Sequence, residues 1–180
     1  MEDQSPRLGY RGRSVVRHRI HASMTTSEHH GFNACLTDYL RVVFCKCPRC
    51  ANRAVIQAES RYAIPWHPIN VRFTCPSCAF HHDWPAPTWE SDFANFDPAN
   101  SREPYFGYTI WAVGQIGGDV LAILNHQHAD DLSAFVILEN RPRPQNSKWS
   151  MVNRLPKWVL LGKNREKVVG LIAQLRALLP

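Results

Sequence analysis

Four of the six cysteines form two copies of one short motif, Cys-Pro-X-Cys. The first copy spans residues 47–50 and the second spans residues 75–78, with 24 residues between them. Two thiolates three positions apart on a tight turn converge on one point, and two such turns can present four sulfurs to one tetrahedral metal ion. The spacing therefore predicts a single zinc ion. Its predicted ligands are Cys47, Cys50, Cys75 and Cys78.

Two other uses of paired cysteines compete with this interpretation. A disulfide framework is typical of secreted chains, and residues 1–35 contain no apolar run of the kind that a secretory signal needs. A redox motif of the thioredoxin type occurs singly beside a βαβ unit, not in two copies. Zinc is favoured over both. Because four thiolates leave no open coordination position, we expect the zinc to be structural.

Three further residues near the motifs have donor atoms that zinc accepts. Cys45 lies two positions before the first motif, and His81 and His82 follow the second motif closely. Two complete motifs already supply four ligands, so we expect these three residues to be bystanders. The sequence leaves their part in the site open.

The segments around the cysteines predict the short antiparallel strands of a zinc ribbon over residues 36–84. Tyr39–Phe44 and Ala54–Ala58 flank the first motif and are rich in residues that favour strands. Ile69–Thr74 alternates apolar with polar residues and leads into the second motif, and Ala79–Trp84 leaves it.

Residues 105–180 predict a β-hairpin followed by helices that pack with the ribbon. Tyr105–Val113 and Asp119–Asn125 are the expected strands, with a glycine-rich turn between them. His126–Asn140 is the expected first helix. An apolar stripe of period 3.6 predicts a last helix that begins after Asn164. The expected fold class is α+β.

Two segments lie outside these elements. Residues 1–35 are rich in arginine and have no sustained apolar period, which predicts a disordered basic extension. Residues 85–104 hold four prolines and four acidic residues, which predicts a linker or covering loop.

Charge is distributed unevenly along the chain, which has a net charge of +6. Residues 141–180 hold nine basic residues against Glu166 alone, whereas residues 22–140 hold seven basic and twelve acidic residues. A basic region on an acidic body favours a polyanion or an acidic protein as partner. The competing interpretation is that the basic residues form a solvated face that keeps the protein soluble, and that Trp158 lies in the core.

The basic region contains a candidate surface for DNA or RNA. Lysine and arginine neutralise phosphates, and an interleaved tryptophan can stack on an unpaired base. The candidate nucleic-acid contacts are Arg154, Lys157, Trp158, Lys163, Arg165 and Lys167.

A second polar group consists of His126, His128, Asp130 and Asp131, which could bind a metal or exchange protons. The two histidines are two positions apart and therefore lie on different faces of a helix. The polar start of a helix explains the group better than a metal or catalytic site.

Several function classes are excluded by what the sequence lacks. It contains no GxxxxGK[ST] phosphate loop, no apolar run near the roughly 20 residues of a membrane-spanning helix, and no nucleophile with a placed base. We expect no membrane contact, no small-molecule cofactor and a cytoplasmic location.

Three stretches extend the pattern beyond the cysteines, namely Tyr105-Phe106-Gly107, Arg154–Trp158 and Lys163–Glu166. With them, residues 38–179 resemble a group of small, uncharacterised bacterial zinc-ribbon proteins. The resemblance implies the zinc-ribbon fold and the four cysteine ligands, and it implies no established function. The chain departs from the group at residues 116–118, where a Cys-Cys-Gly turn is replaced by Ile-Gly-Gly.

The sequence thus predicts a non-enzymatic, zinc-stabilised binding or adaptor protein that contacts nucleic acid through its basic C-terminal region. One alternative is a protein-interaction subunit of a larger bacterial complex that does not touch nucleic acid. A third possibility is a hydrolase with a site that the sequence does not reveal.

Overall fold

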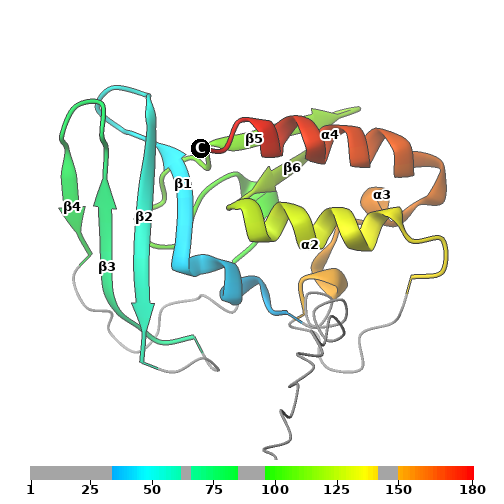
Figure 1. The fold of residues 1–180 in the computed structure, drawn as a ribbon, viewed down its shortest axis with the longest axis horizontal. Coiled ribbons are helices and arrows are strands. Elements are labelled where there is room, and N and C mark those ends of the chain that lie inside the picture. Colours follow the sequence, from blue (N-terminus) through cyan, green and yellow to red (C-terminus); the bar gives the residue numbers. More distant parts are fainter. Residues whose placement is uncertain (1–33, 62–65, 85–95, 142–149) are drawn as a thin grey trace, which may run out of the picture.

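A computed structural model describes residues 34–61, 66–84, 96–141 and 150–180. The fold is α+β, as predicted. A four-stranded antiparallel sheet lies at one end of the molecule, and a two-stranded hairpin with two longer helices lies at the other (Figure 1). Within these residues, no helix is both long enough and apolar enough to cross a membrane.

The helices and strands follow one another in a simple order, with the sheet first and the helices last. The elements are η1 (Leu36–Arg41), β1 (Val42–Lys46), β2 (Arg53–Ser60), β3 (Pro68–Thr74), β4 (His81–Asp83), η3 (Pro98–Asn100), β5 (Ala112–Ile116), β6 (Asp119–Ile123), α2 (His126–Ile137), η4 (Val152–Arg154), α3 (Lys157–Leu160), η5 (Gly162–Asn164) and α4 (Arg165–Ala177).

The four-stranded sheet is built from two hairpins, β1–β2 and β3–β4, joined through β2 and β3. Val43 lies opposite Ile56, and Ile56 lies opposite Phe73. Residues directly opposite one another project from the same face of a sheet, and all three are fully buried. This face is therefore the core face, and the residues between them on each strand form an outer face.

The predicted first strand begins later than the sequence suggested. Residues 39–41 belong to the 3-10 helix η1 instead. The carboxylate of Asp38 accepts a hydrogen bond from the Cys35 N–H at 2.8 Å, which favours a turn over an extended chain. Leu36, Tyr39 and Leu40 then reach the core together.

The prediction of a strand over Tyr105–Val113 is wrong for most of its length, because β5 begins only at Ala112. Glu103 is 2% exposed, and its carboxylate accepts hydrogen bonds from the N–H groups of Tyr105, Phe106 and Tyr108 at 2.6–3.0 Å. These bonds hold a tight turn that covers the core face of the sheet. Gly107 supplies the positive φ of 71° that this turn requires.

The helical layer buries the apolar stripe that predicted the last helix. Val168, Ile172 and Leu175 of α4 are buried, and α4 packs against α2 (Figure 1). On β5, a Cβ atom added to Gly114 would lie 2.6 Å from a methyl group of Leu171. The glycine therefore allows α4 to approach the hairpin closely.

Asn125 joins the sheet to the helical layer. Its side-chain oxygen accepts the His128 N–H at 2.9 Å and caps α2. Its amide nitrogen donates to the carbonyls of Tyr39 at 2.8 Å and Val42 at 2.7 Å. One side chain thus fixes the start of α2 against the junction of η1 and β1.

The predicted flanking segments fall partly outside the described residues, which exclude 1–33 and 85–95 of the expected extension and linker. Of the expected extension, Cys35 pairs with Ser150 and the Ala34 carbonyl accepts the Met151 N–H at 2.7 Å. These two residues therefore belong to the fold.

The first prediction concerns Asn125, which joins the start of α2 to the junction of η1 and β1. Replacing Asn125 with Ala removes a helix cap and leaves two carbonyls without their donor, so we expect the free energy of unfolding to fall by about 2–3 kcal/mol. Urea denaturation followed by circular dichroism measures the change. Asn70→Ala on the outer face of β3 is the control and should stay within about 0.5 kcal/mol of wild type. A loss below about 1 kcal/mol for Asn125→Ala would contradict the assignment.

Candidate metal centre

The two Cys-Pro-X-Cys motifs fold into matching turns at the tips of the β1–β2 and β3–β4 hairpins. In each turn the N–H of the first cysteine donates to the carbonyl five residues on at 2.8 Å. The residue after each motif, Ala51 or Ala79, has a positive φ of 59° or 54°. A left-handed conformation costs a residue with a Cβ about 1–2 kcal/mol, so both turns hold a strained alanine in order to close.

The turns bring together the four cysteines that the sequence predicted. The sulfur of Cys47 lies 3.7 Å from that of Cys78, and the sulfur of Cys50 lies 3.6 Å from that of Cys75. All four sulfurs lie within 4.8 Å of one another. A disulfide requires about 2.05 Å, whereas sulfurs bound 2.3 Å from a tetrahedral zinc ion lie about 3.8 Å apart. The cluster therefore has the geometry of four ligands to one metal ion.

The electrostatics of the cluster also favour a cation. At Cys75, burial opposes ionisation, but hydrogen bonds from the Cys78 and Ser77 N–H groups and the contact with Cys50 lower the pKa to about 7. At Cys78 the Phe80 N–H favours the thiolate, but burial and the neighbouring sulfurs outweigh it and raise the pKa to about 12. Four thiolates this close cannot all ionise alone, and a divalent cation removes the conflict.

An aromatic contact ties the two turns together outside the cluster. The guanidinium of Arg49, from the first turn, lies 4.0 Å from the centre of the Phe80 ring, which follows the second turn. Phe80 in turn contacts buried Phe73 with the ring centres 5.4 Å apart. The approach of the two hairpin tips is therefore supported from the core side as well as by the sulfurs.

The three neighbouring donors are not among the clustered ligands. Cys45 is buried on the core face opposite Ile110, and burial raises the pKa of its thiol well above the usual range. Nδ1 of His82 lies 3.3 Å from the Tyr108 hydroxyl, and the exposed His81 lies opposite Thr74. The expectation that they are bystanders agrees with this arrangement.

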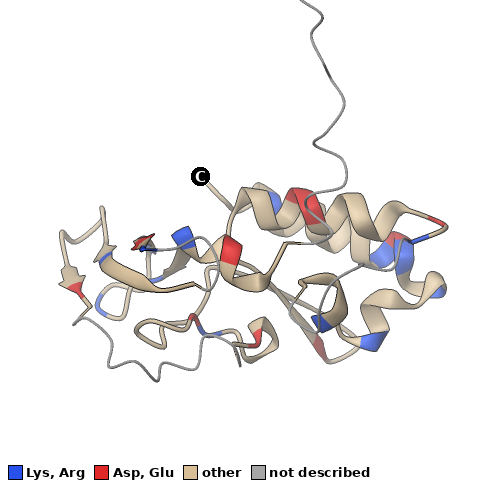
Figure 2. Cartoon of the chain, turned by 90° about the horizontal axis from the view of Figure 1, so that it is seen from below, with Lys and Arg blue, Asp and Glu red and all other residues tan. Residues whose placement is uncertain are grey.

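The basic C-terminal region lies at the other end of the molecule from the metal centre, on η4, α3, η5 and the start of α4 (Figures 1 and 2). Lys157, Lys163 and Lys167 are exposed. The other three candidate contacts, Arg154, Trp158 and Arg165, are only half-buried or packed, and Trp158 lies against the core.

Two observations modify the predicted basic surface. Arg154 donates to the Phe96 carbonyl at 3.1 Å, which gives it a structural role. Arg141, which sequence reasoning did not single out, donates to the carbonyls of Leu160 at 2.6 Å and Val136 at 3.0 Å. Burial and the nearby charge of Arg165 lower the pKa of Arg141. No local pattern marks Arg141, because its neighbours come from three separate elements.

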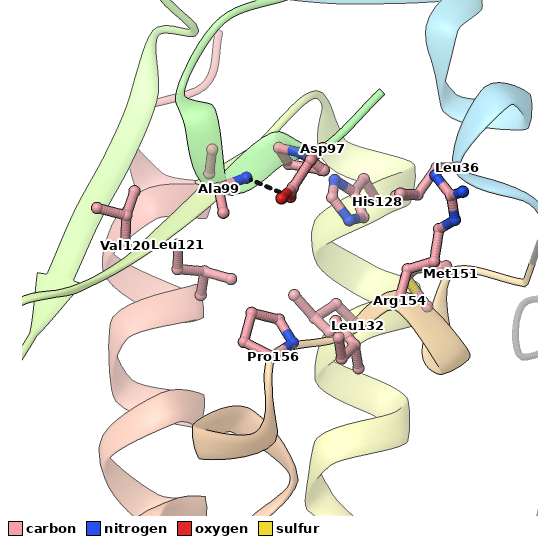
Figure 3. Close-up of a pocket in the computed structure, with 13 residues that line it drawn as sticks. Leu36, Asp97, Ala99, Val120, Leu121, His128, Leu132, Met151, Arg154 and Pro156 are labelled. Carbon is pink, nitrogen blue, oxygen red and sulfur yellow. Dashed lines mark hydrogen bonds between the residues drawn. The ribbon is translucent and has the colours of Figure 1, made fainter. Parts of the chain in front are cut away.

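The histidine and aspartate group does not form a site. His128 is buried, stacks on Tyr39 and accepts the Leu124 N–H at Nδ1, whereas Asp130 pairs with Arg176 at 2.5 Å. His128 borders a cavity of about 30 Å³ between α2, β6 and η4, lined mostly by apolar side chains (Figure 3).

Comparisons with protein-family models, with curated proteins and with solved structures give no match to this chain.

The second prediction tests the ligand set. Cys75→Ser should lower the bound metal from one ion to less than 0.2 ions per chain, because three thiolates and a hydroxyl hold a soft divalent ion poorly. Cys45→Ala, which removes a buried thiol outside the cluster, should keep full metal content. Elemental analysis of the purified variants gives the answer. Equal metal content in both variants would rule out the assigned ligands.

The third prediction concerns pH. Burial lowers the pKa of His128 to about 4, from an ordinary value of 6.5. As pH falls from 6.5 to 4, this histidine binds a proton in the unfolded chain but not in the folded chain. The free energy of unfolding therefore falls by up to roughly 1.4 kcal/mol per pH unit. In His128→Asn the amide oxygen can replace the Nδ1 acceptor, and this part of the pH dependence should vanish. Urea denaturation of both proteins between pH 4 and 7 measures it, and parallel profiles would contradict the assignment.

Proposed function

We propose that this protein is a non-enzymatic binding protein whose four-stranded sheet is stabilised by one structural zinc ion. The observation that carries the proposal is the cluster of four cysteine sulfurs within 4.8 Å. Thiolate ligands in a tetrahedral arrangement favour zinc among the common divalent ions. When bound, zinc supplies folding free energy, on the order of 10 kcal/mol for structural sites of this kind.

The closed ligand set supports a structural role over a catalytic one. A catalytic zinc keeps one position for water, whereas four cysteines occupy all positions of a tetrahedral ion. The four cysteines also agree with the small bacterial zinc-ribbon proteins that the sequence resembles. In this proposal the metal stabilises the sheet, and residues outside the metal site bind the partner.

Nucleic acid is the partner class that we propose for this protein. Support comes from the exposed lysines near the C-terminus, Lys157 on α3, Lys163 in η5 and Lys167 at the start of α4. Within the described residues, none of the three forms an ion pair. Such free cations bind phosphates and release counterions, which makes the affinity depend on salt.

One observation favours the alternative of an acidic protein partner. Ile137, Leu160 and Leu161 are 59%, 38% and 45% exposed, and Leu160 and Leu161 lie between the lysines of α3 and η5. Apolar side chains among free cations also suit a segment that carries both carboxylates and apolar residues. Nucleic acid makes no use of these leucines.

The fourth prediction separates the two partner classes. Zinc-loaded protein should bind fluorescein-labelled single-stranded or duplex DNA or RNA, with log K falling linearly as log salt rises. Lys157→Gln/Lys163→Gln should reduce that slope by about 1.4 for a single strand, since each lost phosphate contact contributes about 0.7. Fluorescence anisotropy at several salt concentrations measures this.

The matched control is Arg41→Gln/Arg61→Gln, which removes the same net charge at the far end of the sheet from the cysteines. An equal effect of both double variants would mean that only net charge matters. Absence of binding at low salt would reject nucleic acid and leave the acidic protein partner.

A further inference from the structure

The end of the sheet that carries the cysteines holds a concentration of positive charge that the sequence does not reveal. Residues 22–140 contain only seven basic residues. Four of them lie on the strands, turns and bridges at this end, namely Lys46, Arg49, Arg53 and Arg102. Arg72 lies opposite Gln57 in the row of Val42, and Arg41 and Arg61 lie beside the far ends of β1 and β2.

Strand register aligns three of these residues in one row on the outer face. Lys46 lies directly opposite Arg53. On its other side, the Lys46 N–H donates to the Thr109 carbonyl at 2.8 Å, and Thr109 lies opposite Arg102. Neighbouring strands are about 4.8 Å apart, so the row extends across about 14 Å of the sheet.

The row has no acidic partner among the described residues, although one guanidinium nitrogen of Arg102 donates to the Gly107 carbonyl at 2.7 Å. The ion pairs there are Arg72 with Asp83 at 2.7 Å and Arg176 with Asp130. Glu103 follows Arg102 but is buried on the core side, where its carboxylate binds backbone N–H groups. Like charges directly opposite on paired strands destabilise a sheet, so the Lys46–Arg53 pair calls for a compensating anion.

The next row of the same face presents rings. Phe44 lies opposite Val55, Val55 opposite Thr74, and Thr74 opposite His81. Phe44 is half-buried and part of it packs against the core, whereas His81 is exposed. Flat rings beside a line of cations are the combination with which sheets bind single strands, since the cations contact phosphates and the rings stack on unpaired bases.

We propose that the outer face at the cysteine end of the sheet is a binding surface for single-stranded nucleic acid, with Arg102, Lys46 and Arg53 on the phosphates and Phe44 and His81 on the bases. The class of ligand rests on the proposed function, whereas the surface is separate from the C-terminal lysines. The metal ion holds both hairpin tips, so the surface depends on the metal.

The fifth prediction uses zinc-loaded protein with fluorescein-labelled dT12 and rU12 and with a 12-base-pair duplex. Lys46→Gln/Arg53→Gln should weaken binding of the single strands at least 10-fold and reduce the salt slope by about 1.4. Arg41→Gln/Arg61→Gln, next to the far ends of β1 and β2 and with the same change in charge, should stay within 2-fold of wild type. The two single strands distinguish DNA from RNA as the source of the ligand.

A second pair of variants tests the rings without changing charge. Phe44→Leu keeps an apolar side chain and His81→Ala removes an exposed one, so both should fold, and each should weaken single-strand binding about 5- to 10-fold with an unchanged salt slope. The duplex should be affected less, because its bases are already stacked.

Three results would overturn the inference. The first is a loss of binding confined to Lys157→Gln/Lys163→Gln, which would leave the proposed function standing with its C-terminal surface alone. The second is faster zinc loss to a chelator in Lys46→Gln/Arg53→Gln with unchanged binding, because the row would then only offset the charge of the cysteine cluster. The third is no binding of any probe at low salt, which would remove the proposed nucleic-acid function as well.

Discussion

The close approach of four sulfurs is the constraint on which the sheet depends. Two unit charges 4 Å apart near a protein surface interact by about 4 kcal/mol, so thiolates within 4.8 Å of one another require a cation between them. Each motif closes a different hairpin, so one ion held by all four sulfurs would couple β1–β2 to β3–β4 at their tips. The β2–β3 ladder couples the same hairpins along their length. The strained Ala51 and Ala79 fit this view, because the turns keep an unfavourable backbone in order to aim their sulfurs.

The helical layer depends on β1 rather than on the metal. The Phe44 N–H donates to the Leu124 carbonyl at 3.0 Å, and the Phe44 carbonyl accepts the Trp111 N–H at 2.9 Å. Asn125 adds two hydrogen bonds from the start of α2. β1 thus belongs to the sheet that carries the cysteine cluster through its pairing with β2, and to the helical layer through its other edge. The protein is organised as two units that share this strand, with the cysteine turns at one end and α3 and the start of α4 at the other (Figure 1).

The parts of the fold that were predictable from sequence are those set by local spacing. The cysteine turns follow from residues three positions apart, and α4 follows from its apolar period, because both patterns lie within a few residues.

The turn held by Glu103 was missed, since it depends on a carboxylate buried by contacts elsewhere in the chain. The row of Arg102, Lys46 and Arg53 was missed for a related reason. Strand pairing brings together residues up to 56 positions apart, and no local pattern marks them. The C-terminal basic residues were singled out by charge count, which could not distinguish exposed Lys157 from Arg154, whose guanidinium donates to a backbone carbonyl.

X-ray absorption at the zinc edge of the purified protein tests the central claim most directly, because it measures the ligands of the metal in the folded chain. The account predicts four sulfur neighbours at about 2.3 Å. Nitrogen or oxygen neighbours at about 2.0–2.1 Å, or fewer than four sulfurs, would contradict it.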